Sequence, residues 1–414
     1  MADTFRICLM HPMDPRGSKI GGIETHVRMI LARHPADFSV LFVGVDEIGD
    51  CALGEIKQVR LGDRTVDFLA VARIGGDKIN LAGKSLGQST TFRFAAGMLR
   101  HLLAIRRALQ GAPASADIQR FEFALIAKLL GLKTVQMVHG EGSKDQKMDS
   151  LIKTYWFVHR FNEGLALRLA NRILCVNPNI IKRMETLYPA AARRAEVMTV
   201  SVDTKFFTPR PFGTQDGIFR IVFAGRLDEF KDPPLMFRVL AALRERLGGK
   251  LEFHYAGTTD PNRYPDFAAI ADLTARHGFQ TADGVKALLE KCHAGILTSY
   301  FEGMPCYLLE TLSAGRPFAA IRLPQYDSLV VESVSGALVE RTDPDADCQA
   351  TLVDAFARLW GDIRDGRIDP VAVHARVDPY SIENQMARLF AHHRALQGRP
   401  ASPALAGVPD SGRA

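Results

Sequence analysis

Two glutamates near residue 300 stand where their carboxylates could hold a nucleotide sugar. Glu302 and Glu310 are separated by seven residues, with Gly303 and Pro305 between them. Carboxylates accept hydrogen bonds from sugar and ribose hydroxyls, whereas the N–H groups at a helix start bind phosphate. The pair therefore predicts a nucleotide-sugar site. On spacing alone, a helix-capping Glu and a second Glu on the surface explain it equally well.

The residues around these glutamates predict a strand, a tight loop and a helix. Ala294–Thr298 is an apolar run short enough to be a buried strand. Pro305 suits the first residue of a helix, because its missing N–H is no loss there. Later residues give the helix an apolar face and then end it: Leu308, Leu309, Leu312, Gly315 and Pro317.

A pair of basic residues follows an earlier predicted strand. Phe219–Gly225 indicates the strand, and Arg226 and Lys231 lie five residues apart on the loop and the start of the next helix. They can be ordinary surface cations. They can also stabilise a leaving diphosphate, because negative charge develops there as a glycosidic bond breaks.

These motifs together resemble a known family. Glu302-x7-Glu310, followed by a small residue, Gly315 and Pro317, resembles the signature of retaining glycosyltransferases of family 4. The stretch from Gly225 is similar to that family's Gly-Arg-Leu-x-x-x-Lys-Gly, with Asp232 in place of the last Gly. The resemblance covers about residues 5–395. It implies the α/β GT-B fold, in which two Rossmann-like doubly wound domains face each other across a cleft.

The resemblance also implies a role for each matching residue. Arg226 and Lys231 would clamp the donor diphosphate, Glu302 would hold the donor sugar, and Glu310 would accept from the ribose hydroxyls. The implied catalytic residues are His139, Glu302, Arg226 and Lys231. The implied donor-binding residues are Gly21, Gly22, Arg226, Lys231, Glu302, Gly303, Met304, Pro305, Cys306, Tyr307, Leu308 and Glu310.

The first half of the chain carries less specific signals. A strand at Phe5–Met10, a loop to Gly21-Gly22 and a helix from Ile23 open a βαβ unit, without the G-x-G-x-x-G pattern. A structural turn explains the Gly pair, but the family has a similar Gly-Gly-x-Glu loop that faces the cleft. His139 ends a predicted strand that begins at Thr134, where ligands bind in open α/β sheets. A lone His is more often structural, yet the family has a similar His-Gly whose His faces the donor sugar.

The order of the predicted elements indicates two domains. The first covers residues 1–207 and is joined by a terminal amphipathic helix at 381–396; the Pro- and Gly-containing stretch 208–217 is the linker, and the second domain covers 218–380. A disordered tail is expected at 397–414. Segment 323–332 lacks the family's usual Gly pair and receives no role. Other predicted elements are strands at 38–43, 66–71, 117–120, 172–176, 197–202, 251–257 and 336–340, and a helix at 91–110.

Composition bounds the remaining possibilities. The chain has 414 residues with a formal net charge of +6, and its six cysteines include no C-x-x-C pair. This usage is typical of reduced thiols in a cytosol and argues against a disulfide or zinc framework. The sequence predicts a cytoplasmic protein without a signal peptide or a spanning helix. We expect no metal and no cofactor, since no D-x-D motif lies in a suitable loop, and we expect no nucleic-acid partner.

Basic charge is concentrated in the first half. Residues 1–200 hold 28 Lys+Arg and 19 Asp+Glu, a net of +9, whereas residues 201–414 have a net of −3. Two apolar stretches rich in basic residues lie there: Thr91–Leu109, and Ile152–Arg172 with Tyr155, Trp156 and Phe157. They predict a peripheral contact with an anionic membrane surface, on the inner face of the cell membrane. The alternative is a basic domain whose aromatic residues belong to the core.

The predicted activity follows from the resemblance. It is transfer of a hexosyl unit, with retention, from a UDP- or GDP-linked sugar to a hydroxyl of a glycan or polyprenyl-linked acceptor, in cell-surface polysaccharide or glycolipid synthesis. Two alternatives stay open: an enzyme like a nucleotide-sugar 2-epimerase, and an inactive sugar-binding scaffold. The intact Glu pair and cation pair argue against the scaffold.

Overall fold

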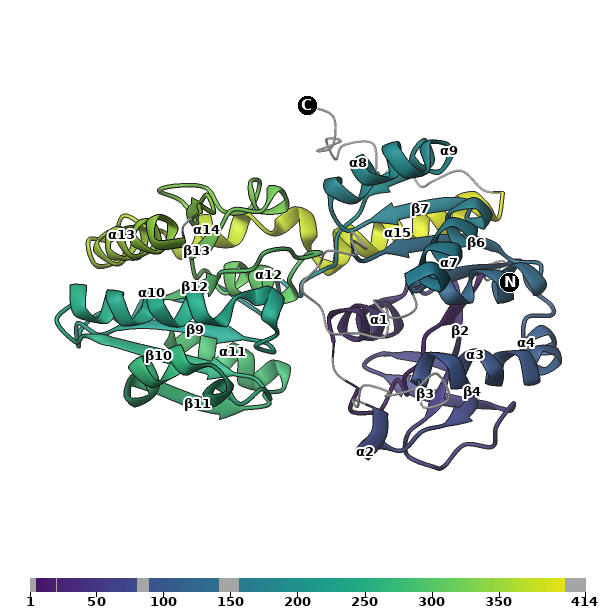
Figure 1. Cartoon of the computed structure of the whole chain (residues 1–414). Coiled ribbons are helices and arrows are strands. Elements are labelled where there is room, and N and C mark those ends of the chain that lie inside the picture. Colours follow the sequence, from purple (N-terminus) through teal and green to yellow (C-terminus); the bar gives the residue numbers. More distant parts are fainter. Residues whose placement is uncertain (1–4, 20, 80–88, 141–155, 344, 399–414) are drawn as a thin grey trace. The chain divides into compact units, whose positions relative to one another are not determined.

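The computed structural model describes residues 5–19, 21–79, 89–140, 156–343 and 345–398. The described residues form two compact units (Figure 1). The first contains the residues up to 200 together with those from 382 onward, and the second contains residues 201–381. Predicted elements that fall within 80–88, 141–155 and 399–414 lie outside the described residues.

The first unit is built on an eight-stranded sheet in the order β3-β4-β2-β1-β5-β6-β7-β8. All neighbouring strands are parallel except β3 and β4, which pair antiparallel. The strands are β1 (Phe5–Met10), β2 (Phe38–Asp46), β3 (Ile56–Leu61), β4 (Arg64–Arg73), β5 (Ala114–Ile118), β6 (Lys133–Val138), β7 (Arg172–Cys175) and β8 (Ala195–Val197).

Helices cover this sheet on both faces because its central strands are apolar on both sides. Helices α1 and α15 contact each other, while α3, α5 and α7 are linked through the short 3-10 turn η2 (Phe121–Phe123). The helices are α1 (Gly22–Arg33), α2 (Gly76–Ile79), α3 (Thr90–Arg100), α4 (Leu102–Ala108), α5 (Ala124–Leu129), α7 (Trp156–Leu169), α8 (Pro178–Leu187), α9 (Pro189–Ala192) and α15 (Ile382–Leu396).

The C-terminal helix α15 belongs to the first unit although it follows the second in sequence. Phe390 packs edge-on against Phe38 at 4.7 Å between ring centroids, and Arg394 forms an ion pair with Asp37 at 2.7 Å. The amphipathic pattern predicted for this helix is confirmed in its buried face, which includes Ile382 and Leu389.

The second unit has a six-stranded, wholly parallel sheet in the order β11-β10-β9-β12-β13-β14. Its strands are β9 (Phe219–Ala224), β10 (Leu251–Ala256), β11 (Thr274–Gly278), β12 (Ala294–Leu297), β13 (Phe318–Ile321) and β14 (Gly336–Val339). Its helices are α10 (Pro233–Arg246), α11 (Ala282–Lys291), α12 (Cys306–Ser313), α13 (Asp345–Arg364) and α14 (Pro370–Ala375). Its 3-10 turns are η3 (Glu229–Lys231), η4 (Pro261–Arg263), η5 (Pro265–Leu273), η6 (Pro324–Tyr326) and η7 (Asp378–Tyr380).

In each unit the strand order reverses next to the first strand. The chain runs outward from β9 to β11 and then returns to place β12 on the other side of β9. It likewise runs outward from β1 through β2 and returns to place β5 on the other side of β1. Ligands of open α/β sheets bind at the carboxyl ends of the strands at such a reversal, because the two loops leave in opposite directions there. The predicted fold class, two doubly wound α/β units, is thus confirmed.

Two local predictions were wrong. The helix expected at 91–110 is two helices, α3 and α4, which break at His101, where φ is −102° and ψ is 20°. The strand expected at 197–202 is only the end of β8, which pairs with β7 up to Val197. The chain then leaves the sheet, and Val202 forms a bridge with Ser381 instead.

Candidate active site

The loops after β9 and β12 bring the predicted cation and carboxylate together in the second unit. Lys231, the last residue of η3, places its Nζ 2.5 Å from Oε1 of Glu302. Ser299 Oγ donates to the same carboxylate oxygen at 2.9 Å, and Gln325 Nε2 donates to the Glu302 backbone carbonyl at 2.8 Å. The Glu302 carboxylate is therefore held by donors from two loops at the start of α12.

Asp232 occupies the position where the family has Gly. Its backbone conformation explains why Gly is common at this position. Its φ of 51° and ψ of 59° are left-handed, a conformation that Gly adopts freely and Asp tolerates better than most residues. The Asp side chain also accepts from Leu235 N at 3.3 Å, as the N-cap of α10, and from Arg341 Nη1 at 2.8 Å. This departure from the family pattern therefore keeps the loop geometry and adds an ion pair.

Arg341 ties that ion pair to the strand that leads to Glu302. Its Nη2 donates to the Thr298 carbonyl at 2.5 Å, and its guanidinium lies 4.0 Å from the centroid of the Tyr300 ring. Thr298 Oγ1 in turn donates to the Lys231 carbonyl at 2.8 Å. These hydrogen bonds thus connect the loop that carries Lys231 to the loop that carries Glu302.

Glu310 lies inside α12, and its carboxyl group has an unusually high pKa. Burial raises its pKa to about 7, and no opposite charge or hydrogen bond from the described residues lowers it again. Cys306, the first residue of α12, has its pKa raised to about 12 by burial and then by the Glu310 and Glu302 carboxylates, so it stays a thiol. Pro305 is the residue before the helix, with φ −70° and ψ 120°, rather than its first residue as predicted.

The other predicted donor-binding residues surround these groups. Arg226 has an exposed guanidinium, 69% accessible, 2.9 Å from Asp228 Oδ2. Gly303 and Met304 lie in the loop before α12, and Tyr307 and Leu308 form the first turn of the helix. Within that turn Leu308 N donates to the Pro305 carbonyl at 3.1 Å, and the positive end of the helix dipole favours an anion there.

Sequence reasoning missed two residues beside Glu302 in the second unit. Gln325 binds the Glu302 carbonyl, as described above, and Tyr326 is fully buried with a hydroxyl that has no partner among the described residues. Burial raises the pKa of Tyr326 well above its ordinary value, and the nearby Glu302 charge adds to the rise. Both lie in segment 323–332, whose missing Gly pair could have indicated that other side chains occupy that space.

The Gly21-Gly22 loop of the first unit follows β1 and contains a buried ion pair. Glu24 Oε1 lies 3.0 Å from His11 Nε2 and 3.2 Å from Lys19 Nζ. A Cβ on Gly21 would lie 2.2 Å from Glu24 Oε2, so Gly is required for this carboxylate to fold back onto the loop. Although burial favours the neutral acid, the His11 hydrogen bond and the Lys19 charge hold the pKa of Glu24 below its usual range.

His139 directly follows β6 in the same unit and contacts other buried polar groups. Its Nε2 lies 2.6 Å from Gln119 Oε1, and its ring is 6.0 Å from that of His26, edge to face. Burial lowers the pKa of His139 well below its ordinary value, and the neighbouring His26 lowers it further. Burial likewise lowers the pKa of His26 and of His11, each to about 4. These histidines are therefore neutral at physiological pH.

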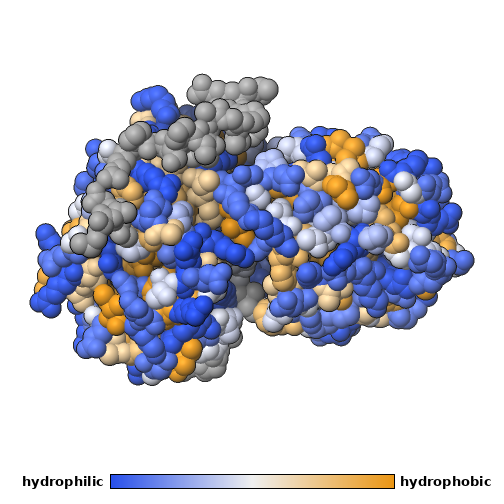
Figure 2. All heavy atoms as spheres, turned by 180° about the vertical axis from the view of Figure 1, so that it is seen from behind, coloured by the Kyte–Doolittle hydropathy of each residue, from blue (hydrophilic) through white to orange (hydrophobic). Residues whose placement is uncertain are grey.

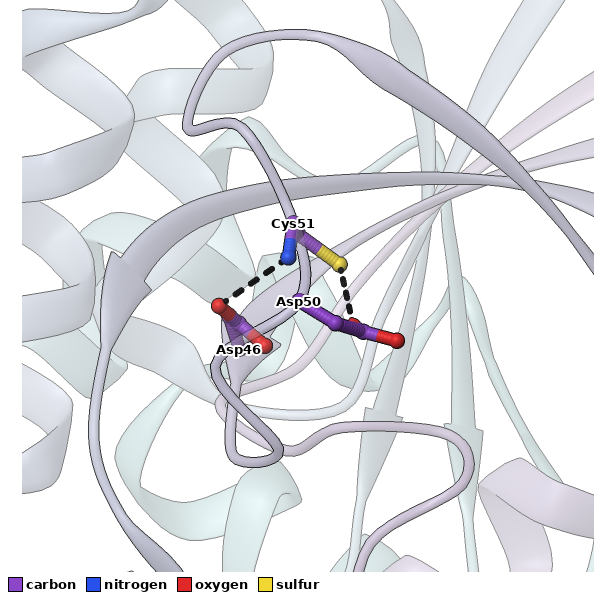
Figure 3. A group of neighbouring side chains, drawn as sticks. All are labelled: Asp46, Asp50 and Cys51. Carbon is purple, nitrogen blue, oxygen red and sulfur yellow. Dashed lines mark hydrogen bonds between the residues drawn. The ribbon is translucent and has the colours of Figure 1, made fainter.

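One cluster in the described part of the chain has the side-chain types of a metal site. Asp46, Asp50 and Cys51 place their ligand atoms within 4.8 Å of one another, as Figure 3 shows. The carboxylates already have cationic partners: Arg73 pairs with Asp46 at 2.9 Å, and Arg16 pairs with Asp50 at 2.9 Å. The cluster is thus an ion-pair network at the end of β2.

Comparison with known proteins places the second unit in a family. Residues 218–362 match the family model described as glycosyl transferases group 1. The second unit belongs to this glycosyltransferase family. The match confirms the family predicted from Glu302, Glu310 and the basic pair, all of which lie within it.

Several curated proteins similar to this chain share one name. D-inositol 3-phosphate glycosyltransferase of Salinispora arenicola is 29% identical over 182 residues, which are 38% of this chain and 41% of that protein. The protein of the same name from Mycolicibacterium vanbaalenii is 26% identical over 249 residues, 55% of each chain. The chain thus spans about half the length of the curated relatives it matches.

Solved structures match this chain over nearly its whole length. Sucrose-phosphate synthase from Thermosynechococcus elongatus has a TM-score of 0.73 at 14% identity, covering 94% of this chain and 98% of that one. A UDP-forming α,α-trehalose-phosphate synthase from Burkholderia xenovorans has a TM-score of 0.65 at 14% identity, covering 95% and 100%. These likenesses show the fold, which is GT-B.

Proposed function

We propose that this protein transfers a hexosyl unit from a nucleoside-diphosphate sugar to an acceptor hydroxyl with retention of configuration. The observation that carries the proposal is the meeting of Lys231, Glu302 and the first turn of α12 at the strand reversal of the second unit. A cation, a carboxylate and a helix start within one loop cluster suit a diphosphate next to a sugar.

The donor would be held by groups of complementary chemistry. Lys231 and Arg226 neutralise the diphosphate, and the N–H groups of the α12 start bind its oxygens. Glu302, released in part from Lys231 when phosphate arrives, accepts from hydroxyls of the sugar. Glu310 accepts from the ribose hydroxyls, and its partner-free carboxylate supports this role. As the glycosidic bond breaks, the cations stabilise the charge that develops on the leaving diphosphate.

For the first unit we propose the roles that the sequence predicted. His139 orients a sugar through one of its hydroxyls, and the Gly21-Gly22 loop lines a ligand site of this unit. Both lie beside the strand reversal of their own sheet, which supports a ligand-binding role. The donor nucleotide is uridine or guanosine diphosphate. The relatives' names include an inositol phosphate and sugar phosphates, so we extend the proposal to an acceptor that carries a phosphate, such as a glycan on a polyprenyl carrier in polysaccharide or glycolipid synthesis.

We also propose that the first unit contacts an anionic bilayer, from which such an acceptor would be collected. No helix in the described part of the chain is long and apolar enough to cross a membrane. Several apolar side chains on α4 and α7 are exposed nonetheless, among them Phe157 at 83% and Leu103 at 68%. Tyr155 and the Trp156 side chain lie outside the description.

Charge complementarity supports the bilayer as the occupant of this surface. We define the apolar-basic surface of the first unit as Phe92, Leu99, Leu103, Phe157 and Phe161 with Arg93, Arg100, Arg106 and Arg107. Aromatic rings next to guanidinium groups suit the headgroup region of a bilayer. The face drawn in Figure 2 shows apolar residues only in small groups among hydrophilic ones.

A substrate panel tests the proposed reaction. The full chain is incubated with UDP- and GDP-sugars, each with and without hydroxyl acceptors, and free nucleoside diphosphate is measured. We expect release that depends on acceptor, with the α-configured donor giving an α-linked product. Conversion of the sugar without release would indicate an epimerase, and binding without any turnover would indicate a scaffold. Either result would overturn the proposal.

A further inference from the structure

A line of buried hydrogen bonds reaches His139 from the C-terminal segment of the first unit. It begins at the Arg6 backbone carbonyl, which can only accept. Gln397 Nε2 donates to that carbonyl at 3.2 Å and to Ser115 Oγ at 2.8 Å. Because Ser115 Oγ accepts from Gln397, its own hydrogen is available to His393 Nδ1, 2.8 Å away. The Asp117 carboxylate, which can only accept, requires a hydrogen on the other ring nitrogen of His393.

The line continues through a buried carboxylate. His393, with Nδ1 accepting, carries its hydrogen on Nε2, which lies 3.3 Å from Asp117 Oδ2. The other Asp117 oxygen accepts from Gln119 Nε2. Asp117 and His393 are 1% and 0% exposed, so water does not compete for these bonds. The Gln119 amide therefore turns its NH₂ to Asp117 and its carbonyl oxygen to His139.

We propose that Gln119, oriented by Asp117 and His393, is a positioning residue that holds His139 in the neutral tautomer with hydrogen on Nε2. The carbonyl oxygen of Gln119 can only accept, and it lies 2.6 Å from that nitrogen. Nδ1 of His139 is then an acceptor. Such a nitrogen selects a ligand that donates a hydrogen bond, which is a hydroxyl group, and rejects an oxyanion.

The charged and titratable groups around His139 agree with a neutral ring. His26 and Glu24 face it from α1, His11 from the end of β1, and Arg120 from the end of β5. Burial is the largest influence and lowers the pKa of His139, and the two histidines act in the same direction. The identity of the hydroxyl as one of the donor sugar rests on the proposed function. The tautomer itself does not.

The tautomer can be measured without any substrate. In the full chain with ¹⁵N-labelled histidine, the His139 signals are assigned by their loss in His139→Gln. We expect a hydrogen on Nε2 and an unprotonated Nδ1 across neutral pH. In Asp117→Asn one face of the new amide is a donor. Because His393 keeps its direction, that donor faces Gln119, whose amide turns over and presents NH₂ to His139. The hydrogen should then move to Nδ1.

Turnover with the donor and acceptor found by the panel gives a second measurement. Asp117→Asn should lower kcat about tenfold or more, the effect of one misdirected buried hydrogen bond. Hydrogen on Nδ1 in the unmodified protein would overturn the proposal. So would an Asp117→Asn variant that keeps both the tautomer and kcat. If no substrate of the panel reacts, the NMR result still decides the tautomer, so the two proposals fail separately.

Two further variants test whether a general loss of structure, rather than the tautomer, explains the effects of Asp117→Asn. Gln119→Glu replaces the NH₂ that faces Asp117 by a second carboxyl oxygen, so the two carboxyl groups should share one proton. The other Glu oxygen still faces Nε2 as an acceptor, so the tautomer should persist. Hydrogen on Nδ1 in this variant would contradict the contact. Gln136→Leu removes a neighbouring buried amide that bonds only to the Ile118 and Met137 carbonyls among its described contacts. It should leave the His139 signals and kcat unchanged.

Discussion

The strand reversals of the two sheets are occupied by opposite chemistry. At the reversal in the second unit stand groups that exchange charge with a ligand: Lys231, Glu302 and a Glu310 carboxylate whose pKa is raised to about 7 by burial. At the reversal in the first unit the histidines are neutral, and the carboxylates of Glu24 and Asp117 are already paired. Under the proposed function, the same architecture thus offers one site fitted to a diphosphate and one fitted to uncharged hydroxyls.

The largest effect should follow from removing the charge of the second site. Replacing Arg226 and Lys231 together by Ala should lower donor-dependent turnover by at least about 10²-fold, the scale for a lost electrostatic contact to a transition state. The matched control is Arg263→Ala with Lys250→Ala, two exposed basic residues of the same unit, which should keep nearly full activity. Near wild-type turnover of the Arg226 and Lys231 double variant would show that these charges do not distinguish the second site from the first.

Glu310 should link donor binding to pH. Ligand hydroxyls require the carboxylate, so donor affinity should fall as pH drops through about 7, and Glu310→Gln should remove that dependence together with most of the affinity. Calorimetric titration with the donor at pH 6 and pH 8 measures it. A pH-independent affinity in the unmodified protein would show that ionisation of Glu310 does not matter.

The same carboxylate should lower the free energy of unfolding when no donor is bound. Its folded-state pKa is raised, so the folded state binds more protons than the unfolded chain between about pH 4.5 and 7, and stability falls as pH rises through that window. Glu310→Gln should therefore raise the free energy of unfolding at pH 8 by about 1–3 kcal/mol, and by much less at pH 5. The exposed Glu245 on α10 provides the control, since Glu245→Gln should change neither value.

Asp232 allows a smaller test of the loop behind Lys231. Asp232→Ala keeps the β-carbon in a left-handed conformation that Ala tolerates less well than Asp, and it removes the N-cap, so it should lower the free energy of unfolding by about 2 kcal/mol. Asp232→Gly meets no such conformational penalty, and its loss should be about half as large. Urea unfolding of both variants gives the order. Because the Arg341 ion pair is lost in both variants, equal losses would mean that the left-handed conformation of residue 232 carries no measurable cost.

The smallest effect concerns the surface of the first unit. Vesicles with anionic lipid should retain the protein at low salt, because each basic residue near such a surface contributes about 1 kcal/mol, and neutral vesicles should not. Phe157→Ser with Phe161→Ser should weaken retention, whereas Phe279→Ser, at an exposed position of the second unit, should not. Equal recovery in the supernatant with both lipids would mean that the acceptor arrives by another route.

The second site could be predicted from sequence because its parts lie in short, contiguous motifs. Arg226, Lys231, Glu302 and Glu310 each follow a strand that the apolar pattern marks, and a single parallel sheet brings those strand ends together. The same pattern predicted the fold class and nearly all the central strands, such as β1, β6 and β9. Edge strand β3 was missed, since its alternating residues are largely exposed.

The first site could be predicted only in outline. His139 and the Gly21-Gly22 loop were identified from their positions, but Gln119, Asp117 and His393 were not, because their contact joins residues up to 276 positions apart. No local periodicity encodes a pairing of that range. The Arg341–Asp232 pair was missed for the same reason, although the Asp in place of Gly was a signal that something compensates.

The position of α15 in the chain sets the order in which the protein can be completed during synthesis. The second unit is contiguous and has all its strands once residue 339 has emerged. The first unit begins earlier but lacks the helix that covers Phe38 and pairs Asp117 until residues near 393 are made. At 5–20 residues per second, the 181 residues between Val200 and Ile382 take about 10–40 s. For that time the ribosome carries a nearly finished sheet that lacks α15, and a cell's chaperones would meet this unit before they meet the other.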